Sequence, residues 1–348
     1  MKKVLNKLEK ENSAYLHEHS NNPVNWISWG DYIQLKSGSY EKKPLFISIG
    51  YSSCHWCHVM AEESFSDEEV AKFLNEHFIA IKVDKEEHPD IDKKYQLFAN
   101  LIGKQGGWPL SIFADFDGRP FFAGTYFPKV EKYGMPSFMD VLKFIVGVYT
   151  NEYKKVELSC EEYENAIKKF YLFEKNIWKG NNFLEEFKTI FDIEKGGIRG
   201  RQKFPNIPVL NYLLEFCEKD EYVMRFLEKT ADSLCTSGIF DHVEGGFFRY
   251  TVDSDWNIPH FEKMLYDNGL NLSFLSRMYS VTDKPLYYNI SKRTADFILK
   301  YFLTGYGFGS SYDADSLNYD GVKQEGFYYL FDEKLIEDLT KDEAELLS

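Results

Sequence analysis

Basic residues and long apolar runs are both scarce in this sequence. Its 348 residues include 41 lysines and arginines against 55 aspartates and glutamates, a formal net charge of −14. Nucleic acid and anionic membrane surfaces bind basic patches, so we expect neither as a partner. No apolar run approaches the roughly 20 residues that cross a bilayer, and none follows the lysines of the opening MKKVLNKLEKENS. We therefore expect a cytoplasmic protein without a membrane span or a secretory signal.

Cysteine is also scarce, which argues against a disulfide framework. Of the five cysteines, Cys54 and Cys57 form a close pair, whereas Cys160, Cys217 and Cys235 are scattered. In a reducing compartment such a pair is more often catalytic or metal-binding than structural. The chain is otherwise rich in apolar residues, with 44% hydrophobic and 17% aromatic residues. This composition and length predict a globular protein with room for two domains.

The pair lies in the stretch YSSCHWCHVM, which is compatible with three chemistries. A C-x-x-C-H string is the haem attachment pattern, but that chemistry requires an exported protein. A dithiol can exchange electrons with other thiols, or simply pack without reacting. A structural zinc site needs four ligands: Cys54, Cys57 and His58 would supply three, and the candidates for the fourth are His17, His19 and His55.

The surroundings of the pair favour the redox interpretation. Apolar runs bounded by breakers predict buried strands at 43–50 and 78–84. Helices are expected at 58–63, at 67–77 with a capping box of Ser66 and Glu69, and at 89–102. A strand, a turn at Asp117-Gly118 and a returning strand follow within 109–127. This order of elements, with a dithiol after the first long strand, is typical of a thioredoxin-like domain.

Position gives each residue of the motif a role. At the first turn of a helix, Cys54 would be an exposed nucleophile whose thiolate the helix N-terminus favours. Cys57, one turn later, would be the buried resolving thiol. His55, next to Trp56 between the two, would add positive charge when protonated and make the disulfide more oxidising. Pro109 follows Trp108 where a thioredoxin fold places a cis-proline facing the dithiol.

Longer motifs carry a resemblance over nearly the whole chain. NPVNWISWG, KPLFISIGYSSCHWCHVMAEESF, IKVDKEEHPDID, GKQGGWPL, FFAGTYFP, QKFP, DHVEGGFFRYTVD, PHFEKMLYDN, YDADS and EGFYYL occur in this order. Together they resemble the thioredoxin-like family that includes spermatogenesis-associated protein 20. The resemblance implies a thioredoxin-like domain followed by an (α/α)6 toroid like those of six-hairpin glycosidases and N-acylglucosamine 2-epimerases. Asn21, Glu244 and Phe248 depart from the family's pattern, and family members are roughly twice this long.

The predicted fold class is therefore α/β plus all-α, in three segments. Residues 1–130 form the thioredoxin-like domain with an N-terminal extension, 131–195 a helical connector, and 196–348 a partial toroid. An internal repeat around Thr230 and Thr294 indicates stacked helical hairpins, with helices near 208–217, 221–236, 260–279 and 284–303. Two to three hairpins fit, so the half-toroid would expose an apolar face. We expect a homodimer or a complementing chain to cover it.

Acidic residues and histidines gather in the loops at the expected toroid mouth. Glycoside hydrolysis needs two carboxylates, and epimerisation needs a proton-transfer pair. In the competing interpretation these residues cap helices, and Arg249 and Lys263 neutralise them. The candidates are Asp241, His242, Asp253, Asp255, His260, Glu262, Asp267, Asp313 and Asp315.

The sequence thus predicts a thiol–disulfide oxidoreductase that acts through Cys54 and Cys57. It would need no cofactor beyond the disulfide, and its substrate would be a protein thiol or disulfide, or a small thiol. The first alternative is a carbohydrate-binding or carbohydrate-modifying toroid with the thioredoxin-like domain as scaffold. The second is a structural zinc protein or an interaction protein. The natural substrate and the direction of electron flow are not encoded in any motif.

Overall fold

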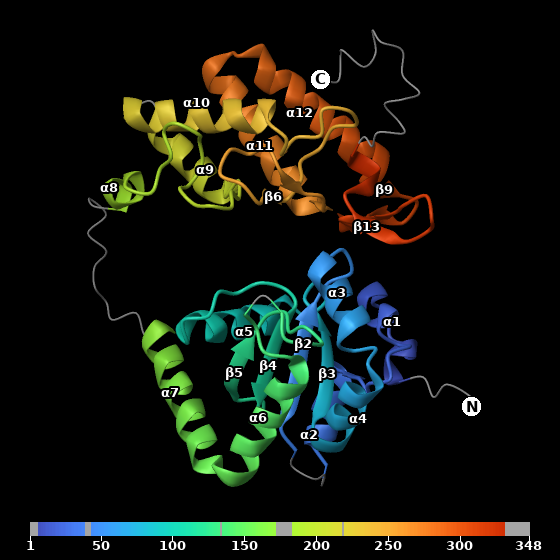
Figure 1. The fold of residues 1–348 in the computed structure, drawn as a ribbon. Helices are drawn as coiled ribbons and strands as arrows, with labels where there is room; N and C mark the ends of the chain where they lie inside the picture. Colours follow the sequence, from blue (N-terminus) through green and yellow to red (C-terminus); the bar gives the residue numbers. More distant parts are fainter. Residues whose placement is uncertain (1–5, 39–42, 133, 172–182, 218, 331–348) are drawn as a thin grey trace. The chain divides into compact units, whose positions relative to one another are not determined.

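The computed structural model describes residues 6–38, 43–132, 134–171, 183–217 and 219–330. The chain divides into two compact units, Met1–Ile177 and Trp178–Ser348 (Figure 1). The helices at 138–151 and 153–171, within the segment predicted as a connector, belong to the first unit. These helices pack on the strands and helices of that unit instead of linking two domains.

A five-stranded mixed sheet forms the centre of the first unit (Figure 1). Its order is β1-β3-β2-β4-β5, with β1 and β2 parallel to β3, and β4 antiparallel to both β2 and β5. This arrangement confirms the thioredoxin-like prediction, to which the short β1 is an addition. The strands are β1 (Ile27–Ser28), β2 (Leu45–Gly50), β3 (Ile79–Asp84), β4 (Leu110–Ala114) and β5 (Pro120–Gly124).

One face of this sheet is aliphatic. Side chains alternate between faces along a strand, and Leu45, Ile47 and Ile49 of β2 all join one apolar cluster. The helices α2 (Trp29–Lys36), α5 (Pro89–Leu101) and α7 (Tyr153–Tyr171) contribute Tyr32, Tyr95 and Tyr163 to it. The helix α5 begins at Pro89 as predicted. This packing explains why it carries apolar residues at helical spacing.

The other face is aromatic and also carries polar residues. Phe46 of β2 lies against the rings of Phe65, Phe113 and Phe138, with centroids 6.1, 5.2 and 5.3 Å away. The helices α3 (His55–Glu63), α4 (Glu68–His77) and α6 (Phe138–Asn151) supply buried residues. By strand alternation, the polar or small residues of β2 and β3 on this face are Ser48, Gly50, Ala80, Lys82 and Asp84.

The start of α4 differs from the prediction. The N-cap is Asp67, whose side chain accepts hydrogen bonds from the amides of Glu69 (3.0 Å) and Val70 (2.9 Å). The Ser66 hydroxyl instead donates to the Ala61 carbonyl at 2.8 Å. The expected capping box is therefore wrong, because the next residue along the chain presents a carboxylate to the same amides.

The segment before the sheet forms two short helical pieces, η1 (Lys7–Lys10) and α1 (Ala14–Glu18). Ser13 caps α1 by accepting from the Leu16 amide at 3.1 Å, and its hydroxyl donates to Asp84 Oδ2 at 2.7 Å. The predicted N-terminal extension is therefore part of the fold, joined to the end of β3.

The second unit is a partial toroid of helical hairpins. The helix expected at 260–279 begins five residues later, because residues 259–260 and 263–264 pair in short strands. None of the helices within the described ranges is long and apolar enough to cross a membrane. The helical elements are α8 (Phe183–Lys188), α9 (Ile207–Leu213), η2 (Leu214–Phe216), α10 (Glu221–Thr236), α11 (Leu265–Thr282), α12 (Pro285–Phe297), the π-helical η3 (Ile298–Phe302) and η4 (Phe327–Tyr329).

Short antiparallel pairs join these helices. They are β6 (Tyr250–Thr251) with β7 (Pro259–His260), β8 (Lys263–Met264) with β11 (Ser311–Tyr312), β9 (Leu303–Thr304) with β10 (Gly307–Phe308), and β12 (Asp315–Leu317) with β13 (Lys323–Glu325).

A buried lysine fixes each of two similar glycine loops in this unit. Lys203 donates to Asp192 Oδ2 at 2.7 Å and to the Gly196 carbonyl at 2.9 Å. The second loop repeats the pattern with bonds of 2.6 and 3.0 Å, made by Lys263 to Asp241 Oδ2 and to the Gly245 carbonyl. The D-x-x-x-G-G loops at 192–197 and 241–246 therefore share a buried ion pair, a likeness separate from the predicted repeat around Thr230 and Thr294.

Candidate functional site

The Cys54–Cys57 pair forms a disulfide at the N-terminus of α3. Cys54 is the N-cap residue of that helix, and the two Cα atoms are 5.2 Å apart. The Cys57 amide donates to Cys54 Sγ at 3.2 Å, and the His58 amide donates to the Cys54 carbonyl at 3.2 Å. The backbone of the first turn thus directs an N–H group at the sulfur that the sequence assigns as nucleophile.

Both sulfur-bearing residues are buried. Cys54 is 4% exposed and Cys57 is 1% exposed. The prediction of a buried Cys57 is confirmed, but the prediction of an exposed Cys54 is wrong. The physical reason is local: as N-cap residue, Cys54 turns its sulfur back over the first helical turn, toward the Cys57 amide.

Pro109 lies at the same end of the sheet as the disulfide. The Trp108–Pro109 peptide bond is cis, as the thioredoxin-like prediction requires. Leu110, the next residue, pairs with Ile49 near the end of β2. The Trp108 ring lies 5.6 Å from the ring of Tyr51, which precedes the dithiol turn. The peptide before Pro109 is thus brought to the loop that leads into Cys54.

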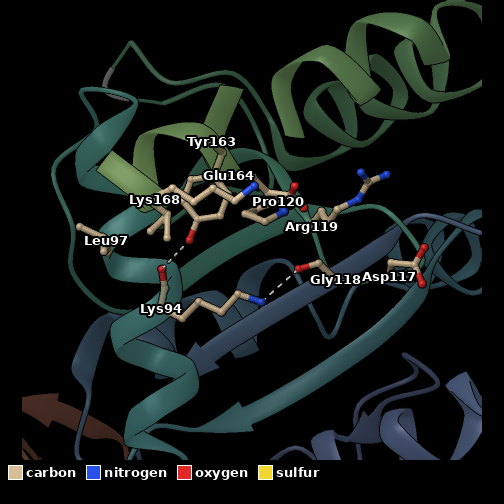
Figure 2. Close-up of a pocket in the computed structure, with 10 residues that line it drawn as sticks. Lys94, Leu97, Asp117, Gly118, Arg119, Pro120, Tyr163, Glu164 and Lys168 are labelled. Atoms are coloured by element: carbon tan, nitrogen blue, oxygen red, sulfur yellow. Dashed lines mark hydrogen bonds between the residues drawn. The ribbon is translucent and has the colours of Figure 1, made fainter. Parts of the chain in front are cut away.

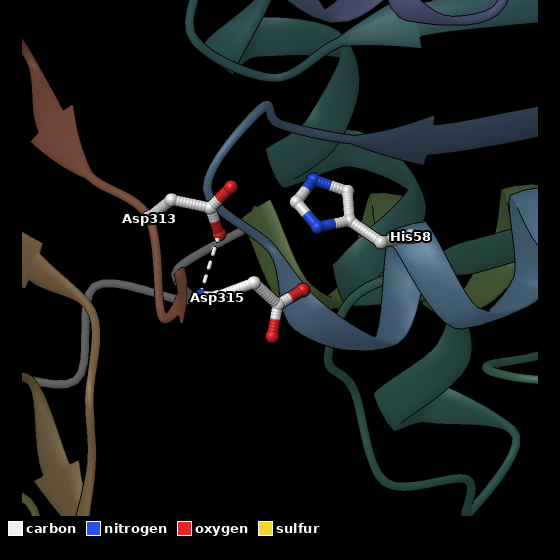
Figure 3. Close-up of side chains that lie close together, drawn as sticks. All are labelled: His58, Asp313 and Asp315. Carbon is white, nitrogen blue, oxygen red and sulfur yellow. Dashed lines mark hydrogen bonds between the residues drawn. The ribbon is translucent and has the colours of Figure 1, made fainter. Parts of the chain in front are cut away.

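The residues between and after the cysteines differ in exposure. Trp56 is 42% exposed, and its ring lies 5.6 Å from that of His55 and 5.1 Å from that of Tyr126. His58 projects from α3 (Figure 3), with Nε2 2.6 Å from the Ser52 carbonyl and 3.7 Å from Glu18 Oε2. Trp56 therefore offers an aromatic surface beside the dithiol.

The zinc set proposed from the sequence is not assembled in this oxidised state. The sulfurs of Cys54 and Cys57 are joined to each other. His19 is buried, with Nδ1 2.8 Å from Asn22 Oδ1, and burial is the main cause that lowers its pKa. Zinc binding by the reduced pair stays a prediction.

A buried lysine lies on the aromatic face of the sheet. Lys82 of β3 is fully buried, and its ammonium group donates to Ser48 Oγ at 3.0 Å. The nitrogen lies 5.0, 5.0 and 4.5 Å from the ring centroids of Tyr15, Trp26 and Phe65. Burial lowers the pKa of Lys82 well below its ordinary value. The sequence analysis missed this residue, since a lysine inside IAIKVD gives no sign of being enclosed.

A pocket of about 390 Å³ opens at the opposite end of the first unit's sheet, beside the β4–β5 turn (Figure 2). Lys94 of α5 donates to the Gly118 carbonyl at 3.4 Å, and the Tyr163 hydroxyl of α7 donates to the Lys94 carbonyl at 3.3 Å. These polar groups bind other parts of the wall. The pocket therefore gives no indication of a ligand and is remote from the dithiol.

In the second unit, two of the predicted carboxylates stabilise their own loops. Asp241 accepts from Lys263 Nζ and from the amides of Val243 (2.8 Å) and Glu244 (3.0 Å). Asp253 accepts from several amides of the loop that follows it, at distances of 2.5 to 3.2 Å. Their hydrogen bonds match the competing interpretation, in which acids satisfy backbone donors.

A second group of predicted residues does come together. His260 Nδ1 lies 2.5 Å from Glu325 Oε1, and its Nε2 lies 3.7 Å from Glu262 Oε1. Arg249 donates to Glu262 at 2.8 Å, and its Nε lies 3.9 Å from Asp267 Oδ2. Glu325 was not predicted as a site residue: it opens the EGFYYL motif, but it follows His260 by 65 residues, and nothing in that motif indicates the contact.

The remaining candidates lie elsewhere in this unit. Asp315 donates its amide to Asp313 Oδ1 at 3.0 Å (Figure 3). Lys323 pairs with Asp313 at 3.3 Å. His242 Nε2 lies 3.0 Å from the Ser237 carbonyl, and Asp255 pairs with Lys195 at 2.8 Å. The sequence therefore grouped residues that the structure distributes over several loops of this unit.

Known proteins match both parts of the chain. The solved structures include a DsbH oxidoreductase (TM-score 0.28, 18% identity, 37% of this chain and 86% of that chain). Cellobiose 2-epimerase from Bacillus thermoamylovorans B4167 gives a TM-score of 0.34 at 18% identity, covering 45% of this chain and 51% of the enzyme.

Sequence relatives extend over almost the whole chain. An uncharacterised protein of Caenorhabditis elegans is 38% identical over 97% of this chain and 48% of its own length. Spermatogenesis-associated protein 20 of Mus musculus is 34% identical over 97% of this chain and 45% of its own length. The chain thus spans about half the length of these curated relatives. Residues 5–168 match the profile of the family Thioredox_DsbH, described as a protein of unknown function, DUF255. Residues 5–168 therefore resemble this thioredoxin-like family, and nearly the whole chain is similar to about half of spermatogenesis-associated protein 20.

Proposed function

We propose that the Cys54–Cys57 pair performs thiol–disulfide exchange. The observation that carries this proposal is the disulfide itself, formed between the N-cap of α3 and the residue one turn later. The adjacent cis-Pro109 supports it, because the peptide before it is held beside the dithiol turn.

The roles of the two cysteines follow from their positions. Cys54 is the less buried of the two and lies at the positive end of the helix dipole, which stabilises a thiolate. It therefore attacks the substrate sulfur, and Cys57 resolves the mixed disulfide by attacking Cys54. A protonated His55 next to Cys54 would favour the same thiolate and make the disulfide more oxidising.

The substrate is a thiol or disulfide of a protein or of a small molecule. An extended peptide would lie along the backbone before Pro109, and the exposed ring of Trp56 would contact its side chains. The acidic balance of the chain, −14 at pH 7, disfavours acidic partners. A reducing compartment such as the cytoplasm would keep the pair available as a dithiol.

The carbohydrate alternative is less well supported. Of the carboxylates predicted at the toroid mouth, Asp241 and Asp253 bind amides of their own loops. His260 with Glu262 and Glu325 is an acid–base group, but Arg249 already neutralises Glu262. The second unit is therefore assigned no catalytic role here.

The test is to measure the oxidation state of each cysteine by differential alkylation and mass spectrometry in a series of glutathione buffers. We expect Cys54 and Cys57 to interconvert in one reversible two-electron step, at a potential between about −270 and −180 mV. Cys160, Cys217 and Cys235 are buried free cysteines and serve as internal controls that stay reduced. A pair that forms no disulfide under any oxidant would contradict the proposal.

A further inference from the structure

A tyrosine from outside the predicted motif lies beside the resolving cysteine. Tyr15 of α1 is fully buried. A Cβ atom added to Gly50, the last residue of β2, would lie 2.2 Å from the Tyr15 hydroxyl oxygen and 2.7 Å from Cys57 Sγ. The oxygen and the sulfur therefore border the same small volume, which is open only because residue 50 is a glycine.

The Tyr15 hydroxyl has no hydrogen-bond partner within the described residues. The Ser48 hydroxyl accepts from Lys82 at 3.0 Å, and as a donor beside the Tyr15 oxygen it acts to lower the pKa of Tyr15; it does not serve as an acceptor for the Tyr15 O–H. Buried hydroxyl groups are nearly always paired, because burying one without a partner costs free energy. An orphaned donor at a reactive sulfur indicates a partner that exists only in another state of the site.

The sulfur of Cys57 changes its charge during exchange. When Cys57 resolves a mixed disulfide, it loses its proton and its thiolate attacks Cys54 Sγ; the S–S bond to the substrate breaks, and the electron pair leaves on the substrate sulfur. In the reverse direction a substrate thiolate attacks Cys54 Sγ, and the electron pair of the Cys54–Cys57 bond leaves on Cys57. Both directions place a negative charge on a sulfur that is 1% exposed, where water cannot stabilise it.

We propose that Tyr15 is a catalytic residue of this exchange, donating a hydrogen bond from its hydroxyl to Cys57 Sγ whenever that sulfur is a thiolate. The inference deepens the proposed function and rests on it. In the disulfide state the sulfur carries no charge, which accounts for the hydroxyl being left without a partner.

The charged groups around Tyr15 are consistent with a donor role. Burial, followed by the charges of Asp84 and Glu18, raises the pKa of Tyr15 well above its ordinary value, so its hydroxyl keeps the proton that it donates. Lys82 lies over the ring at 5.0 Å, and His19 lies beside it at 4.9 Å. His58 of α3 has its Nε2 3.7 Å from Glu18 Oε2 and 2.6 Å from the Ser52 carbonyl.

The experiment is a stopped-flow reaction of the reduced full chain with the aromatic disulfide DTNB, comparing wild type with Tyr15→Phe. Cys54 releases the first thionitrobenzoate and forms a mixed disulfide; Cys57 then displaces the second. We expect Tyr15→Phe to leave the first phase unchanged and to slow the second about three- to tenfold at pH 7, because the thiol pKa rises. The second-phase rates of wild type and Tyr15→Phe should become equal at a pH above the pKa of the Cys57 thiol in both proteins.

Two controls assign the phases. Cys57→Ser must abolish the second phase. Tyr32→Phe removes a different buried hydroxyl, which donates to the Phe116 carbonyl at 3.0 Å, and should leave both phases unchanged. If the second phase of Tyr15→Phe is unaltered, or is slowed equally at every pH, the role of Tyr15 is overturned and the proposed exchange by Cys54 and Cys57 still stands. A wild type without a second phase would overturn the proposed function together with this inference.

Discussion

At the scale of single residues, the aromatic face of the first unit's sheet encloses a charge. Lys82 donates a hydrogen bond to Ser48, and three aromatic rings lie around its ammonium group. Cation–π contacts and a hydroxyl acceptor replace only part of the hydration that an ammonium group loses on burial. Burial is accordingly the main cause that lowers its pKa, and the folded state holds this proton less tightly than the unfolded state.

This difference predicts how Lys82→Met changes stability with pH. Because the folded pKa is lowered, the unfolded chain binds more protons between that pKa and about 10.5, so the stability of the wild type rises with pH in this window. Methionine removes the buried charge, and we expect Lys82→Met to raise the free energy of unfolding by about 1–3 kcal/mol at pH 7. The difference in unfolding free energy between Lys82→Met and wild type should shrink as the pH approaches 10.

Denaturant titrations of the full chain, followed by tryptophan fluorescence at several pH values, would measure this effect. Lys36→Met provides a matched control, since Lys36 is exposed and donates to the Asp117 carbonyl on the surface. A lower stability of Lys82→Met at every pH would show instead that the cation–π contacts outweigh desolvation.

The residues that could be predicted from the sequence lie within single motifs, whereas those that could not are defined by contacts between distant segments. Cys54, Cys57 and Pro109 were predicted because each stands in a motif of fixed spacing at a strand end. Tyr15 and Lys82 were missed because their role depends on contacts between segments 67 residues apart in the chain. No periodicity or spacing within one segment encodes such a contact.

At the scale of elements, the presence of a helix was easier to predict from the sequence than the residue at which it begins. The helix α4 was expected at nearly its observed position, because its apolar face follows the helical period. Its cap was assigned to Ser66, although Asp67 performs that role and also pairs with Lys129 at 2.8 Å. Ser66 and Asp67 are adjacent and both are good N-cap residues. The sequence alone does not distinguish them, because a shift of the helix start by one residue decides which of them is the N-cap.

The cap of α4 yields a matched pair of variants. We expect Asp67→Ala to cost about 1 kcal/mol of unfolding free energy at pH 7, and Ser66→Ala to cost less, because only Asp67 accepts from the first-turn amides. The hydrogen bond from Lys129 is the largest cause that lowers the pKa of Asp67 below 3.8. The contribution of ionised Asp67 to the free energy of unfolding is therefore present above pH 3.8, and it is lost as the pH falls through the pKa of Asp67 in the folded state.

Thermal unfolding of both variants between pH 3 and pH 7 would check this prediction. The difference between Asp67→Ala and wild type should narrow at the acidic end, whereas Ser66→Ala should show no such trend. A larger cost for Ser66→Ala would restore the capping box proposed from the sequence.

At the scale of the whole molecule, the second unit presents apolar side chains on its last two hairpins. Leu303 and Phe308 lie on the β9–β10 hairpin and are 49% and 52% exposed, and Tyr306 in its turn is fully exposed. On the β12–β13 hairpin, Leu317 is 65% exposed and Val322 is 59% exposed. Monomeric proteins seldom leave neighbouring apolar residues of this size in water, because each costs hydrophobic free energy.

This surface leads to a prediction about assembly, in which we propose a second copy of the chain as the occupant. Multi-angle light scattering should give a dimer mass at high protein concentration. The double variant Phe308→Asp with Leu317→Asp should shift the mass toward the monomer, because a charge buried at an interface must be desolvated. Val130→Asp, at an exposed position of the first unit, should leave the mass unchanged. A wild type that remains monomeric at every concentration would contradict the prediction, and the hairpin surface would then have to be covered by a different chain.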